Sequence, residues 1–91
     1  MRLFFSPLAE QDLEDIADYI ATDNPIRALS FLQELREHCQ RISANPQGYR
    51  LRPEFGDGIR SCAHGRYAIF FTSGADEVTI VRVLHGARDF P

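Results

Sequence analysis

The sequence predicts an α+β fold with the element order β-α-α-β-β-β, in which a helix hairpin packs on a small, mainly antiparallel sheet. In the first half of the chain, two stretches carry apolar residues at the three- and four-residue spacing of amphipathic helices. In the second half, three short runs rich in β-branched and aromatic residues follow one another, separated by glycine-containing turns. With 91 residues, the chain is expected to form a single domain, residues 1–91.

The chain is expected to open with a short strand and a helix. The run RLFF at 2–5 reads as the strand, since it precedes any turn residue. Ser6 then supplies an N-cap, and Pro7 occupies the first helical position, where its missing N–H is harmless. Acidic residues fill the positions between the apolar ones, which predicts an acidic amphipathic helix that ends near Asn24.

A second helix is expected to follow at once. Asn24 can cap it and Pro25 can occupy its first position, while Asn45-Pro46 closes it. Because only about two residues join the helices, they should form an antiparallel hairpin. Residues 46–58 hold two prolines and three glycines without a sustained period, so we expect a long loop there. Three strands are then expected within 59–65, 66–72 and 77–85.

Charge and composition narrow the classes of function. The net charge is −3, all ten basic residues are arginine, and residues 1–45 hold eight acids against four arginines. Proteins that bind nucleic acid by neutralising phosphates usually carry a basic excess, which is absent here. No stretch is long and apolar enough for a membrane span or a signal peptide, so a cytoplasmic location without membrane contact is expected. Cys39 and Cys62 are expected to be buried free thiols.

The last predicted strand carries an arginine among apolar neighbours. Strict alternation from Val78 would put Arg82 and Leu84 on the same face as Val78 and Ile80. It would put Val83 and His85 on the other face, with Thr79 and Val81. Arg82 could pair with an acid of the first helix, or it could line a concave binding face with Arg60 and Arg88. Both possibilities remain open from the sequence.

Few residues offer catalytic chemistry. His64 and His85 could act as general acid or base, although no nucleophile stands beside either of them in the sequence. The three histidines and two cysteines lack metal-ligand spacing, and no phosphate-binding loop is present, so neither a metal nor a cofactor is expected. Composition and spacing alone therefore predict a fold but no function.

Four stretches carry a resemblance that covers nearly the whole chain. They are SPLAEQDLEDIADYIATDNPIRA, ANPQGYRLRPEFGDGIRS, GRYAIFF and VRVLHGARDFP. In this order they resemble the two helices, the Pro/Gly loop with its arginine-bearing strand, and the last two strands of ParE-type toxins in the RelE/ParE superfamily. The β-α-α-β-β-β order agrees with that fold.

The resemblance implies the toxin component of a bacterial type II toxin–antitoxin system, neutralised by a cognate ParD-like antitoxin. It implies inhibition of DNA gyrase rather than catalysis, with contact to operator DNA only through the antitoxin. We expect Arg60, Arg82, His85 and Arg88 to form a polar rim on an apolar face that the antitoxin covers. An amphipathic antitoxin segment could place apolar anchors in such a groove and its acids on the arginines.

Two alternatives are kept. A ribosome-dependent mRNA endoribonuclease of the RelE type would use Arg60, Arg82 and His85 as catalytic residues. The absence of lysine, and Phe90 where some such nucleases have a catalytic aromatic hydroxyl, weigh against it, because arginine stays protonated and is a poor base. The other alternative is an inactive homologue that only binds its antitoxin.

Overall fold

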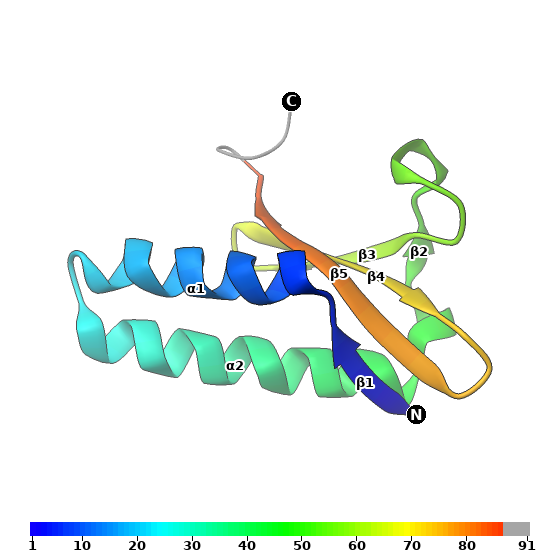
Figure 1. The fold of residues 1–91 in the computed structure, drawn as a ribbon, viewed down its shortest axis with the longest axis horizontal. Coiled ribbons are helices and arrows are strands. Elements are labelled where there is room, and N and C mark those ends of the chain that lie inside the picture. Colours follow the sequence, from blue (N-terminus) through cyan, green and yellow to red (C-terminus); the bar gives the residue numbers. More distant parts are fainter. Residues whose placement is uncertain (87–91) are drawn as a thin grey trace.

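The computed structural model describes residues 1–86 of the chain as one five-stranded sheet and a helix hairpin (Figure 1). The sheet has the strand order β1-β5-β4-β3-β2. The strands and helices are β1 (Arg2–Phe5), α1 (Pro7–Ala21), α2 (Pro25–Ala44), β2 (Arg50–Leu51), β3 (Arg60–His64), β4 (Tyr67–Ser73) and β5 (Glu77–His85), with short 3₁₀ turns η1 (Pro46–Gly48) and η2 (Pro53–Phe55).

The predicted helix starts are confirmed by their capping contacts. The Ser6 hydroxyl accepts a hydrogen bond from the Ala9 N–H at 3.0 Å, and the Asn24 side chain accepts one from the Arg27 N–H at 3.0 Å. The Ser6 hydroxyl also donates to the Val81 carbonyl at 2.8 Å, so the same residue fastens the start of α1 to β5. The first helix ends at Ala21, slightly earlier than predicted.

The sheet is mixed but mainly antiparallel, as predicted. β1 and β5, from opposite ends of the chain, pair in parallel, with Phe5 opposite Ile80. The other three strand pairs are antiparallel. Figure 1 shows α1 and α2 lying side by side in opposite directions.

The two faces of the sheet differ in what covers them. The side chains packed with the helices are the fully buried ones, including Phe71 and Ile80 of the sheet and Leu13 and Leu35 of the helices. Burial of large apolar side chains here supplies most of the stabilisation. We call the side of the sheet that packs against the helices the helix-covered face. The other side, which carries Phe70, is called the open face.

The prediction of a structureless loop at residues 46–58 is wrong. The segment contains η1, η2 and the two-residue strand β2, which extends the sheet by pairing Arg50 with Ser61 and Leu51 with Arg60. Backbone pairing with β3, rather than any local apolar pattern, forms this strand. The prediction of free cysteines is confirmed, although Cys62 is only half-buried while Cys39 is buried.

Candidate functional site

An apolar groove of about 160 Å³ lies on the open face of the sheet. Its lining residues are Phe55, Ile59, Phe70, Val81, Arg82 and Leu84. The groove thus joins the end of the segment before β3 to the middle of β4 and the second half of β5.

Aromatic packing builds one wall of the groove. The Phe55 ring, carried by η2, meets the Phe70 ring of β4 edge-on, with 5.0 Å between the ring centroids. Phe70 is only 4% exposed, whereas Phe55 is 45% exposed. Phe55 therefore covers Phe70 and keeps its own outer surface available for contact.

A β-bulge builds the opposite wall. Phe70 pairs with Arg82 while the next residue, Phe71, pairs with Ile80, so Val81 is an extra residue in β5. Beyond the bulge, Val83 is 1% exposed and joins Val78 and Ile80 in the core. The prediction of strict alternation along this strand is therefore wrong. The bulge places Arg82 and Leu84 beside Val81 at the groove, on the face opposite Val78 and Ile80.

Arg82 is bound to the first helix, which confirms one of the two possibilities left open by the sequence. Its Nε and Nη2 donate to the two carboxylate oxygens of Asp12 at 2.8 and 2.9 Å. The same carboxylate accepts the Val83 N–H at 2.9 Å, and Asp12 is only 8% exposed. Because β1 pairs with β5 only as far as Ile80, the Val83 N–H has no partner in β1, and Asp12 accepts it instead. The half-exposed Arg82 borders the groove.

A second arginine, Arg52, lies at the groove and was not predicted from the sequence. Arg52 lies over the Phe55 ring, 4.9 Å from its centroid, and donates to Glu54 at 2.9 Å and to the Ser61 hydroxyl at 3.0 Å. Because residues 46–58 were expected to be a structureless loop, nothing placed Arg52 against the sheet. An aromatic residue three positions after an arginine was the only available hint.

Among the predicted rim residues that the structure describes, Arg82 borders the groove, whereas Arg60 and His85 lie elsewhere. Arg60 lies opposite Phe71, on the helix-covered face, and donates to the Tyr49 carbonyl at 2.6 Å and to Gln47 at 2.7 Å. His85 lies opposite Tyr67, with their rings 5.0 Å apart, and Tyr67 belongs to the core. Arg88 lies outside the described residues. The binding or catalytic roles of these residues stay predictions, but Arg60, Arg82 and His85 do not share a face.

The cysteines provide no activated nucleophile in this structure. Burial raises the pKa of the Cys39 thiol to about 12 and that of the Cys62 thiol to about 11. Across residues 1–86, no three His, Cys, Asp or Glu side chains are placed to hold a metal ion. None of the helices in that range is long and apolar enough to cross a membrane.

Comparisons with known proteins agree over almost the whole chain. A family profile described as the ParE toxin of the type II toxin–antitoxin system, parDE, matches residues 3–90. Toxin ParE1 from two strains of Mycobacterium tuberculosis, CDC 1551 / Oshkosh and ATCC 25618 / H37Rv, is 32% identical over 90 residues, which is 97% of this chain and 92% of that protein. A solved structure titled "Chromosomal ParDE TA system from P. aeruginosa" superposes with a TM-score of 0.79 at 24% identity, covering 93% of this chain and 95% of that one.

Proposed function

The chain belongs to the ParE toxin family of type II toxin–antitoxin systems, and from that premise we propose that a ParD-like antitoxin neutralises it by binding the open-face groove, and that its cellular target is DNA gyrase. The observation that carries the first part is the combination of an apolar floor and an arginine border in one place. Phe55 and Leu84 offer apolar surface, and Arg52 and Arg82 stand beside it.

These features fit an amphipathic, acidic antitoxin segment. Its apolar side chains would occupy the groove, and its carboxylates would meet the exposed parts of the two guanidinium groups. The two guanidinium groups also distinguish the groove border from α1, which presents acids to solvent, although each already pairs with one acid of the chain, Glu54 or Asp12. An acidic segment is thus favoured at the groove and disfavoured along α1.

The family resemblance supports gyrase as the proposed target, and the placement of the arginines argues against the nuclease alternative. A RelE-type nuclease needs a proton acceptor and charge-stabilising groups gathered at one phosphate. Arg60 and Arg82 are on opposite faces of the sheet, and each is held by another residue of the chain. This arrangement favours a protein that binds its target over one that cleaves RNA.

Gyrase assays with the purified toxin test the proposal. We expect the toxin to block supercoiling and to accumulate double-strand breaks in the presence of gyrase, and we expect the cognate antitoxin to suppress both effects. The matching control is the toxin with DNA but without gyrase, which should leave the DNA intact. Cleavage of ribosome-bound mRNA without any effect on gyrase would overturn the target in favour of the nuclease. Normal colony counts on induction without antitoxin would instead indicate an inactive homologue.

A further inference from the structure

Two histidines from different layers of the fold share one hydrogen bond. His38 of α2 and His64 of β3 approach through their Nδ1 atoms at 2.8 Å, and both rings are half-buried. A ring nitrogen either carries a proton and donates, or is bare and accepts. The contact therefore needs one neutral acceptor ring, and it cannot form when both rings are fully protonated.

Neighbouring side chains hold the two rings in this position. The Phe31 ring of α2 packs edge-on against His64 at 5.3 Å and also packs against Tyr67 of β4. On its other side, His38 Nε2 lies 3.6 Å from the Cys62 Sγ. The pair is thus a built contact between α2 and the sheet, on the helix-covered face and away from the groove.

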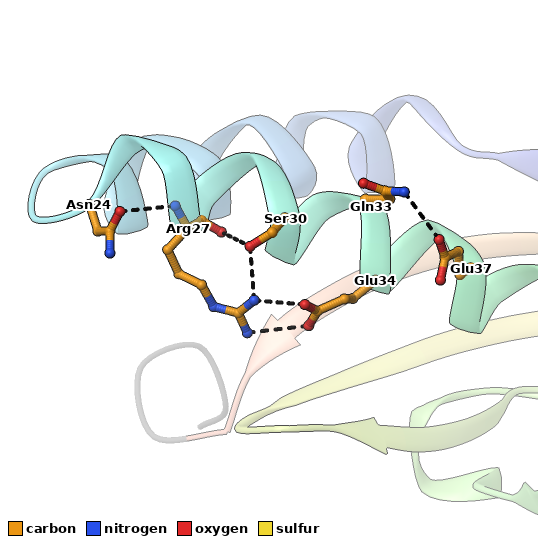
Figure 2. Close-up of polar contacts among 6 residues, drawn as sticks. All are labelled: Asn24, Arg27, Ser30, Gln33, Glu34 and Glu37. Carbon is orange, nitrogen blue, oxygen red and sulfur yellow. Dashed lines mark hydrogen bonds and ion pairs between the residues drawn. The ribbon is translucent and has the colours of Figure 1, made fainter.

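The charged groups around the pair do not compensate a second positive charge. Glu34 favours the protonated form of His64, but its carboxylate is held by Arg27 through hydrogen bonds of 2.7 and 3.2 Å (Figure 2). Arg41 and Arg27 disfavour the protonated form. Cys62 of β3 remains a neutral thiol, and Tyr67 of β4 contributes an aromatic ring rather than a charge.

We propose that the His38–His64 contact is a proton-controlled latch that fastens α2 to β3 in neutral solution and opens in acid. This latch does not depend on the identity of the antitoxin or of the cellular target. Its opening would loosen one helix of the hairpin from the sheet edge while leaving the groove residues in place.

The sign of the effect follows from the direction of the pKa shifts. Burial lowers the pKa of His38 and of His64 below the ordinary value of 6.5, and a positive charge on His64 lowers the pKa of His38 further. The folded protein then binds fewer protons than the unfolded chain as pH falls below about 6.5. The stabilisation is therefore present above that pH and is lost as acid protonates the pair.

Thermal unfolding at pH 7.5 and pH 5.5 tests the latch. We expect the melting temperature of the wild-type protein to fall between these pH values by about 5 °C more than that of the double variant His38→Gln, His64→Gln. His85→Gln, which keeps both rings of the pair, is the matched control for a histidine-to-glutamine change. Equal losses of melting temperature in the wild type and the double variant would overturn the latch.

Histidine titration by NMR tests the latch in the unmodified protein, whether or not the double variant folds. We expect His38 and His64 to titrate in separate steps below the ordinary value, with one shared Nδ1 proton at neutral pH. His64→Gln should move the His38 pKa back toward 6.5. A single, independent step near 6.5 for both rings in the wild type would contradict the proposal.

Discussion

Changing Asp12 to asparagine is expected to lower the melting temperature by about 10–20 °C, the largest stability effect of any single polar substitution proposed for this protein. The carboxylate accepts three hydrogen bonds, two from Arg82 and one from the Val83 N–H, and it is nearly buried. Breaking a buried ion pair costs about 3–5 kcal/mol, and the partial exposure of Arg82 reduces this to about 2–3 kcal/mol. In a domain of this size each kcal/mol corresponds to about 4–8 °C.

Asp18→Asn is the matched control for this experiment. Asp18 belongs to the same helix and its side chain is exposed, so the same chemical change should alter the melting temperature by about 2 °C or less. Thermal unfolding followed by circular dichroism measures both variants. Equal melting temperatures for Asp12→Asn and the wild type would show that the carboxylate does not fix the end of β5.

Changing Leu84 to glutamate is expected to weaken antitoxin binding about a hundredfold or more. Leu84 lines the groove, and a carboxylate there would place a charge on apolar surface that the antitoxin must cover. It would also compete for Arg82 with the acids of the antitoxin. A loss of about 3 kcal/mol, typical of a central interface residue, corresponds to this change in dissociation constant. Isothermal titration calorimetry with the cognate antitoxin measures it.

Leu29→Glu provides the control for the groove variant. Leu29 is 73% exposed on α2, so the same substitution there should leave antitoxin affinity within about twofold of the wild type and should preserve the fold. In cells, the Leu84 variant should stay toxic when the antitoxin is co-expressed, whereas the Leu29 variant should be neutralised. If the Leu29 change weakens binding as much as the Leu84 change, or if neither does, the groove is not the binding surface.

The sequence was sufficient to predict the regular elements because their determinants are local. Ser6 and Asn24 cap the helices as expected, since a cap acts within one helical turn. The strand β2 was missed because two residues carry no period, and only the partner strand β3 defines it. The longer strands could thus be predicted from their own residues, whereas β2 could not, because only its pairing with β3 defines it.

The site was harder to predict because it depends on contacts between distant parts of the chain. Two hydrogen bonds lie at the bulge around Val81. The Ser6 hydroxyl donates to the Val81 carbonyl, and the Val83 N–H donates to the Asp12 carboxylate, so both side chains come from the first fifteen residues. These contacts reverse the face of Val83 and turn Arg82 toward α1. For the same reason Arg82→Glu is a poor probe of recognition, since it would also break the pair with Asp12.

Hydrogen exchange of the toxin, free and bound to its cognate antitoxin, tests the central claim most directly. If the antitoxin covers the open face, binding should slow exchange of backbone amides in 53–59, in β4 and in 81–84, while the outer turns of α2 around Leu29 should exchange at the same rate in both states. Protection confined to α1 and α2, with no change in those three segments, would contradict the account.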